Sequence, residues 1–377
     1  MGQSTRRQFI KSSVTGAGVL VTGAGLGQAT PTVNAQVNSQ ATSQTTSAQG
    51  PQAMAQEVSD KLFANDGLAR PVPATPVASD LAKGLDRTLV LGGGGEYYVA
   101  WYCGFFHGLA EQGLDLRALA ELVVGTSAGS YMGSALTSGH FERLRTEFEF
   151  FGRFPALFAK LAPVANPNIS QQRALEVNLR VTDGSNASIR TIGHAALAAD
   201  NKVNGPAVER LAWLLTGDSK TGWPPSNMVT TANDCYTGER LIVTQSIARK
   251  NNIALAHAAA ASSSLPGMIG PTLLGQRYGM DGGIAISTSH VDVVAGSKRA
   301  LVITLTDGLT GAKLTGIPHN VHDEIKSLEA TGTLAMLIVA GTPPGVNLLD
   351  PTQIEPALRT GYARAKTEGP KIREFWA

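Results

Sequence analysis

An apolar strand runs directly into a glycine-flanked serine in one central stretch, Glu121-Leu122-Val123-Val124-Gly125-Thr126-Ser127-Ala128-Gly129. A strand that leads into a G-x-S-x-G sequence turns sharply, and the small flanking residues let the serine project at the start of the next helix. Four glycines, Gly92 to Gly95, lie about one helix upstream. Backbone N–H groups at a helix N-terminus favour negative charge, which a tetrahedral oxyanion carries. Together the two motifs predict an acyl-transfer site with a serine nucleophile.

The segments around these motifs alternate between strand and helix patterns. Short loops between a strand, a helix, a second strand and a second helix indicate parallel strands in an α/β sheet. The expected elements are strand Arg87–Leu91, a helix from about Val99 to Gln112, strand Leu122–Val124, helix Ser130–Leu136 and a further buried strand Ala300–Leu305.

The middle of the chain, from Phe148 to Ser226, is predicted to be mostly helical. It begins with an aromatic cluster, for which we expect core packing rather than a lid that contacts lipid. A hairpin is expected between Met228–Ala232 and Arg240–Thr244, and an alanine-rich helix from Ile253 to Ser263. The cluster contains Phe148, Phe150, Phe151, Phe154 and Phe158.

The N-terminal residues have the pattern of an export signal. Arg6 and Arg7 are followed by an apolar residue and a lysine, then by a mildly apolar stretch. We therefore expect a twin-arginine signal over residues 1–35 and export of the mature chain. Residues 36–79 are rich in Gln, Ser, Thr, Ala and Pro, which predicts a disordered linker, with the folded domain that carries the serine over 80–377.

Composition excludes several classes of function. The chain has 377 residues, of which 43% are hydrophobic, so it can bury a sizeable core. Without residues 1–35 the net charge is about −1, which gives no electrostatic drive towards nucleic acid. No later segment reaches about 18 uninterrupted apolar residues, so no transmembrane span is expected. Cys103 and Cys235 are read as free rather than paired, and no cofactor motif or metal-ligand spacing is present.

A serine hydroxyl is a weak nucleophile unless a base takes its proton during the attack. The candidates are a carboxylate acting directly, or a histidine oriented by a carboxylate. Asp281 stands out because Met280-Asp281-Gly282-Gly283 places a carboxylate at a strand end among glycines. The missing side chains let another loop, such as the serine turn, approach closely. A tight turn is the ordinary interpretation of Asp-Gly-Gly, but the two other motifs in this chain favour a catalytic role.

These motifs resemble the patatin-like phospholipase family from about Asp86 to Leu305, with a helical tail to Lys366. The resemblance implies a three-layer α/β/α fold with a mainly parallel central sheet, and a serine–aspartate dyad without a catalytic histidine. On that pattern Ser127 attacks the acyl carbonyl of a lipid or other ester, Asp281 takes its proton, and water releases a fatty acid from the acyl-enzyme. The amides of Gly93, Gly94 and Gly95 would stabilise the oxyanion. The motif glycines are Gly92, Gly125, Gly129, Gly282 and Gly283, and the matching segments include Ala258–Gly267, Tyr278–Gly283 and the Asn233–Gly238 hairpin.

One departure and three alternatives remain. Many family members carry a basic residue shortly after the glycines, whereas this chain has Glu96. This departure weakens the expectation of a preference for phospholipids more than the expectation of ester hydrolysis. An α/β-hydrolase triad with His290, His319 or His322 follows the right chain order, but only one helix and one strand separate the glycines from the serine. A nucleotide-binding glycine loop and a non-catalytic lipid-binding protein on the same fold are the other readings. Acyl-chain length, headgroup, oligomeric state and contact with a membrane surface stay open.

Overall fold

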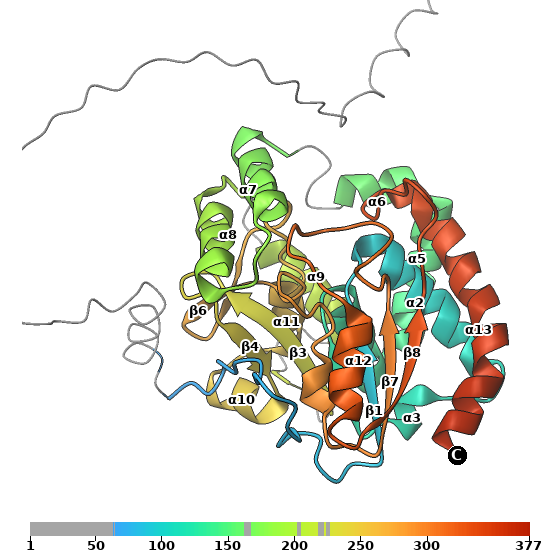
Figure 1. Ribbon diagram of the computed structural model, residues 1–377. Helices are drawn as coiled ribbons and strands as arrows, with labels where there is room; N and C mark the ends of the chain where they lie inside the picture. Colours follow the sequence, from blue (N-terminus) through green and yellow to red (C-terminus); the bar gives the residue numbers. More distant parts are fainter. Residues whose placement is uncertain (1–62, 64, 162–166, 202–204, 218–221, 224–226) are drawn as a thin grey trace, which may run out of the picture. The chain divides into compact units, whose positions relative to one another are not determined.

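The computed structural model describes residues 63, 65–161, 167–201, 205–217, 222–223 and 227–377 (Figure 1). The expected signal, residues 1–35, and most of the expected linker lie outside the described residues. Within the described part, no helix combines the length and apolar character needed to cross a membrane.

A single sheet forms the centre of the described fold, in the strand order β5-β6-β3-β2-β1-β7-β8, with β4 pairing with β3. The four pairings around β1 (β3/β2, β2/β1, β1/β7 and β7/β8) are parallel, while β4, β5 and β6 pair antiparallel at one end. The sheet is therefore mainly parallel, as predicted. The strands are β1 (Arg87–Leu91), β2 (Leu122–Gly125), β3 (Met228–Asp234), β4 (Arg240–Val243), β5 (Thr272–Leu274), β6 (Arg277–Asp281), β7 (Arg299–Thr304) and β8 (Leu334–Val339).

Helices cover both faces of the sheet. Since alternate side chains of a strand point to opposite faces, each central strand contributes to two apolar cores. In β1, Leu89 and Leu91 belong to the larger apolar core and Val90 to a second, smaller one. The larger core lies under α2 (Gly95–Ala110), α4 (Ala128–Thr137), α5 (Phe141–Arg153), α9 (Gly205–Thr216), α11 (Leu255–Ser262) and α13 (Ile354–Trp376). The smaller core lies under α12 (Val321–Glu329) and the short helix η1 (Val291–Val294). The result is the expected α/β/α arrangement with one thick and one thin helical layer (Figure 1).

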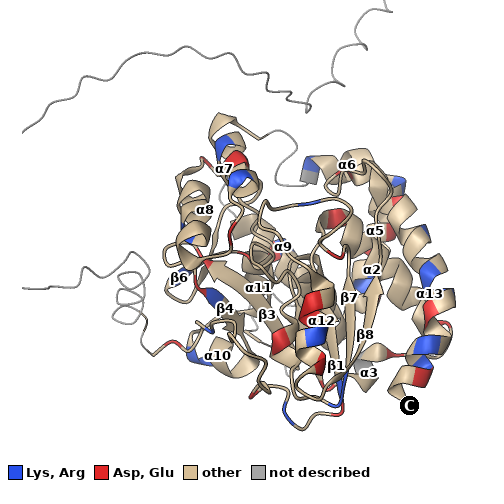
Figure 2. Cartoon of the chain, in the orientation of Figure 1, with Lys and Arg blue, Asp and Glu red and all other residues tan. Residues whose placement is uncertain are grey.

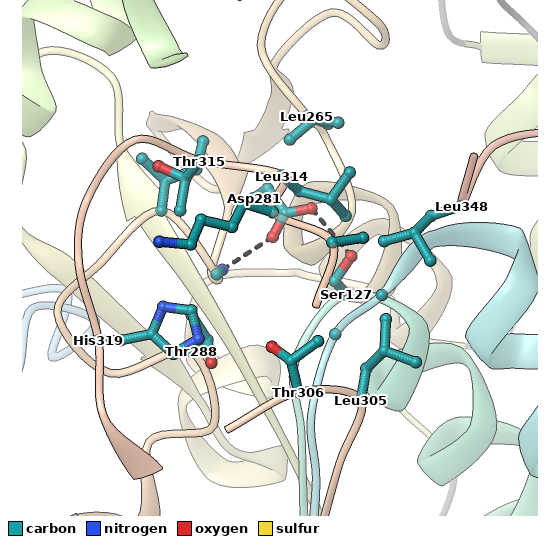
Figure 3. Close-up of a pocket in the computed structure, with 16 residues that line it drawn as sticks. Ser127, Leu265, Asp281, Thr288, Leu305, Thr306, Leu314, Thr315, His319 and Leu348 are labelled. Carbon is teal, nitrogen blue, oxygen red and sulfur yellow. Dashed lines mark hydrogen bonds between the residues drawn. The ribbon is translucent and has the colours of Figure 1, made fainter. Parts of the chain in front are cut away.

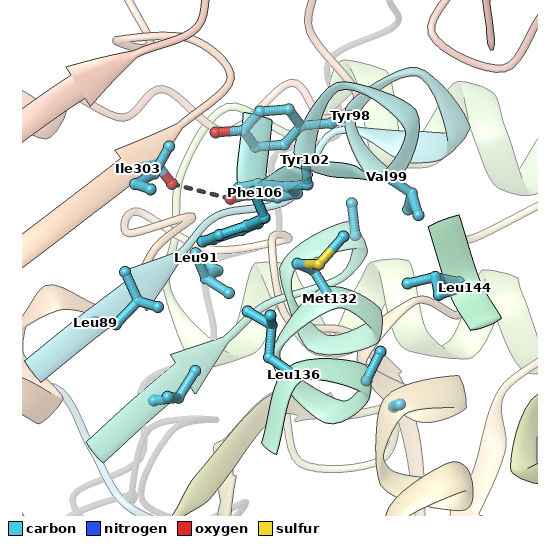
Figure 4. Close-up of a cluster of buried hydrophobic side chains, with 14 of the residues drawn as sticks. Leu89, Leu91, Tyr98, Val99, Tyr102, Phe106, Met132, Leu136, Leu144 and Ile303 are labelled. Carbon is cyan, nitrogen blue, oxygen red and sulfur yellow. Dashed lines mark hydrogen bonds between the residues drawn. The ribbon is translucent and has the colours of Figure 1, made fainter. Parts of the chain in front are cut away.

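Side chains of the larger core pack α2 against the sheet. Tyr102 on α2 lies among Leu91, Tyr98 and Met132, and its hydroxyl donates a hydrogen bond to the Ile303 carbonyl at 3.1 Å (Figure 4). The remaining helices are α3 (Leu116–Leu119), α6 (Pro155–Leu161), α7 (Ile169–Arg180), α8 (Asn186–Ala198), α10 (Gln245–Lys250) and η2 (Pro351–Gln353). Charged side chains lie mainly on the outer helices and loops, and both signs occur along α13 (Figure 2).

The expected strands, the hairpin and the alanine-rich helix are confirmed to within a few residues. Two boundaries differ. Helix α2 begins at Gly95 rather than near Val99, because the glycine loop itself forms the helix N-terminus. The C-terminal helix α13 continues past Lys366 to Trp376 and packs along α2.

The structured chain also begins before Asp80, where we expected its start. Leu68 is fully buried, and Ala69 forms a β-bridge with Leu241 on β4. Arg277, 2% exposed, forms ion pairs with Asp66, Asp234 and Glu239. The composition of this segment does not predict these contacts. One buried leucine and one paired carboxylate hold the segment in place, and neither produces a repeating apolar pattern in the sequence.

Candidate active site

The pairing register of β3 brings the serine and aspartate motifs together. Thr230 on β3 lies between Gly125 of β2 and Val243 of β4. Two residues later, Ala232 lies between Leu241 of β4 and Asp281 of β6. Since β4 follows one edge of β3 throughout, β2 and β6 must share the other edge, one after the other. The chain that leaves β2 therefore meets the end of β6.

Ser127 occupies a strained turn between β2 and α4. Its backbone has φ 51° and ψ −119°, in a region that side chains other than glycine rarely adopt. The Ser127 N–H donates a hydrogen bond to the Ser262 hydroxyl on α11 at 2.8 Å, which holds the turn in place. The side chain is 7% exposed. This is the geometry of a nucleophile elbow, as the sequence predicts.

Asp281, the last residue of β6, faces this serine. The Ser127 hydroxyl donates a hydrogen bond to Asp281 Oδ2 at 2.9 Å, and the Gly283 N–H donates one to Oδ1 at 2.8 Å (Figure 3). Burial raises the pKa of Asp281 to about 6, while the hydrogen bonds from Gly283 and Ser127 lower it in part. The carboxyl group is thus ionised at neutral pH and has a higher proton affinity than an exposed aspartate.

The motif glycines allow the loops to approach one another. A Cβ atom on Gly93 would lie 2.9 Å from Ser127 Cβ, so only glycine fits beside the serine. A Cβ on Gly282 would lie 2.5 Å from the Thr231 hydroxyl on β3. The other motif glycines are also in close contact: Gly92 accepts the Tyr102 hydroxyl, Gly125 and Gly129 meet each other across the elbow, and Gly283 binds Asp281.

The glycine run lies at the N-terminus of a buried helix. Gly94 is the N-cap of α2, and Gly95 is its first residue. Gly93 and Gly94 line a small cavity together with Ser127, and Gly95 lines a larger one. Backbone N–H groups in the first turn of a helix have no intrahelical acceptor. The loop is therefore placed to act on negative charge that develops beside the Ser127 oxygen.

The histidines of the alternative triad form no hydrogen bond with the serine or the aspartate. Among the described residues, none donates to or accepts from Ser127 or Asp281. His290 is buried and donates from Nε2 to the Gly282 carbonyl at 2.8 Å, while burial and Arg240 lower its pKa to about 4. His319 lines the small cavity, and His322 pairs with Asp307 at 3.7 Å. A neutral His290 thus supports the loop that carries Asp281.

Two cavities meet at the Ser127–Asp281 pair. The small cavity, about 60 Å³, is lined by Leu305, Leu314 and Leu348 and by the polar residues Thr288, Thr306, Lys313 and His319 (Figure 3). The large cavity, about 430 Å³, runs between α2, α4, α5, α9 and α11. Its wall is mostly apolar and includes Val99, Leu144, Phe148, Phe151, Phe158, Leu211, Leu214, Met268 and Ile269. Part of the aromatic cluster expected to pack in the core therefore faces this cavity.

Sequence reasoning missed two residues of the site. Ser262 supports the elbow, but it is one of three consecutive serines in an alanine-rich segment, so no pattern distinguishes it. Glu96 stands out in the sequence only as a departure from a family pattern, and it proves to line the large cavity. Both described cysteines, Cys103 and Cys235, are buried and free. Within the described residues, no group of three or more His, Cys, Asp or Glu side chains is arranged to hold a metal ion.

Comparisons with known proteins bear on the family of the chain. Among solved structures, a similar chain is VipD from Legionella pneumophila, with 14% identity, a TM-score of 0.36, and coverage of 80% of this chain and 72% of that one. A comparison with curated proteins found no match. A family model for patatin-like phospholipases matches residues 89–293, which is more than half of the chain and includes both Ser127 and Asp281. On that match, the chain belongs to the patatin-like phospholipase family.

Proposed function

We propose that the protein is a serine-dependent lipid acyl hydrolase that acts through a Ser127–Asp281 dyad and an acyl-enzyme. The hydrogen bond of 2.9 Å between the Ser127 hydroxyl and Asp281 Oδ2 carries this proposal. An ionised carboxylate at that distance can take the serine proton as the oxygen attacks. A separate histidine is not required for this step.

The reaction has two halves. In the first, the Ser127 oxygen bonds to the acyl carbon, its proton passes to Asp281, and the carbonyl oxygen becomes an oxyanion beside the amides of Gly93, Gly94 and Gly95. Collapse of this intermediate breaks the ester bond, and the leaving alcohol takes the proton. In the second half, water gives its proton to Asp281 and attacks the acyl-enzyme, which releases the fatty acid and returns the proton to Ser127.

The cavities support a lipid as the substrate. The large cavity has a volume within the range of about 300–1,000 Å³ typical of small-molecule sites, and its apolar wall suits an acyl chain. The small cavity then receives the alcohol part of the ester. Phe150, Phe154 and Leu157 are exposed, and Phe150 contacts both Phe154 and the cavity-lining Phe151, which supports docking at a membrane surface. Export through the signal over residues 1–35 remains part of the proposal.

The test combines active-site labelling with a panel of esters of varied chain length. We expect a fluorophosphonate to label Ser127, and Ser127→Ala and Asp281→Asn to lose hydrolysis. Ser327→Ala, which changes an exposed serine on α12, should retain both properties. Hydrolysis that survives Ser127→Ala would contradict the nucleophile assignment. A folded protein that neither accepts the label nor cleaves any ester would instead be a binding protein on this fold.

A further inference from the structure

Glu96 is an acidic residue in the wall of the large apolar cavity. It is the second residue of α2, directly after the glycine loop, and it lines the cavity together with Gly95, Ser127 and Ala128. One carboxylate oxygen, Oε2, is buried and has no hydrogen-bond partner among the described groups. The carboxyl group also interacts with its own backbone N–H. The residue as a whole is half-buried and lines the cavity, so one hydrogen-bonding position of a cavity-lining carboxyl group remains unused.

The surrounding polar groups do not satisfy this oxygen. Tyr131, which lines the same wall, interacts through its hydroxyl with Ser263. Arg210, the one basic residue among those that line the cavity in the described structure, is exposed to solvent. Burial raises the pKa of Glu96 to about 7. A buried carboxyl oxygen without a hydrogen-bond partner costs free energy, and a ligand that supplies a partner removes that cost.

We propose that Glu96 binds a hydroxyl group on the acyl chain, so that the preferred substrates are esters of hydroxylated fatty acids. This inference rests on the proposed function, since it takes the large cavity as the acyl site. Glu96 follows Gly95 directly, so the hydroxyl must lie within a few carbons of the carbonyl that meets Ser127. A hydroxyl group also fits the surroundings better than a cation, which would lose its hydration against the apolar wall.

The decisive comparison uses two substrates that differ only in the hydroxyl, the p-nitrophenyl esters of dodecanoate and β-hydroxydodecanoate. We expect the wild-type kcat/KM to be at least about tenfold higher for the hydroxylated ester, because one hydrogen bond to a carboxyl group typically changes affinity by about this factor. Glu96→Leu should reduce this ratio to about one, and the ratio rather than the absolute rate is the readout. Glu96→Gln, which keeps a carbonyl acceptor, should retain part of the preference.

The matched control is Glu209→Leu, which makes the same change at an exposed position on α9 outside the cavity lining. It should keep the wild-type ratio. A second readout does not depend on turnover: Ser127→Ala protein should bind β-hydroxydodecanoate more tightly than dodecanoate in calorimetry, and the double variant with Glu96→Leu should not.

Equal kcat/KM values for the two esters in the wild type would overturn the inference, as would a Glu96→Leu variant that loses both activities in proportion. Neither result would affect the proposed function, because fluorophosphonate labelling of Ser127 and cleavage of the plain ester are measured on the same proteins. Should Glu96→Leu fail to fold, the wild-type ratio and the nearly isosteric Glu96→Gln still decide the question.

Discussion

Replacing Asp281 with asparagine should abolish hydrolysis and at the same time stabilise the fold at neutral pH. The asparagine would keep the size of the side chain, with its oxygen accepting from the Gly283 N–H and its NH2 group donating to the Ser127 hydroxyl oxygen, but it cannot take a proton. Loss of a general base typically lowers the rate by about 10²- to 10⁴-fold. The gain in stability follows because the wild-type carboxylate is ionised while 5% exposed, and the amide carries no charge.

The size and pH range of this gain follow from the pKa. Burial raises the pKa of Asp281 from 3.8 to about 6, roughly two pH units. At ~1.36 kcal/mol per unit, ionisation destabilises the native state by about 3 kcal/mol above pH 6. Between about pH 4 and pH 6 the native state binds the proton more tightly than the unfolded chain, so wild-type stability falls as pH rises. Asp281→Asn should therefore be more stable by up to about 3 kcal/mol at pH 7 and lose this advantage below about pH 4.

The assay is chemical denaturation of both proteins at a series of pH values, with their difference in unfolding free energy plotted against pH. Other buried acids, such as Glu96 and Glu324, titrate in both proteins and cancel in this difference. An asparagine variant that is less stable than the wild type at pH 7, or a difference that does not change with pH, would refute the reasoning.

Three further predictions concern the same machinery. The wild-type kcat/KM should fall as pH drops through about 6, because protonated Asp281 cannot act as a base, and Glu96→Gln should retain this limb of the pH profile. Gly93→Ala should lose most fluorophosphonate labelling with little change in circular dichroism, since its Cβ would lie 2.9 Å from Ser127 Cβ; unchanged labelling would show that the loop can yield. Arg277→Met should lower the unfolding free energy by about 3–5 kcal/mol, because it leaves three carboxylates without their buried partner, and a variant as stable as the wild type in urea would contradict this.

The sequence predicted the sheet well because its strands depend on local patterns, and the two side chains proposed as a dyad, Ser127 and Asp281, do form a hydrogen bond. Short apolar runs such as Arg87–Leu91 are strands buried on both faces, and the small residues around Ser127 and Asp281 mark tight turns. That the elbow and the end of β6 meet was expected from the glycines beside Asp281, which allow a close approach, and from the family resemblance. The reason they do meet is the register of β3, which pairs with β2 and then β6 along one edge.

Features that depend on tertiary packing were not predictable in this way. The large cavity forms between α5, α9 and α11. The apolar faces of these helices would have the same sequence pattern if the helices packed together without a cavity. The apolar run Leu334–Val339, which forms β8, lies beyond the matched family segments and was not identified as a strand. Glu96 has an acidic side chain that a surface position would equally explain, so only the structure reveals that it lines the cavity with one carboxylate oxygen buried.

The hydrogen-bonded Ser127 and Asp281 lie 154 residues apart in the chain, and Ser262, which accepts from the Ser127 N–H, lies 135 residues from the elbow. Contacts of such long range form late and slowly when a chain refolds, because the entropy lost in closing large loops is recovered only once the whole sheet is paired. Regained catalysis should consequently lag behind the recovery of helical signal after dilution from denaturant. A turnover measurement would then report the fraction of molecules in which the whole sheet has paired, and would not count molecules that are compact but incompletely folded.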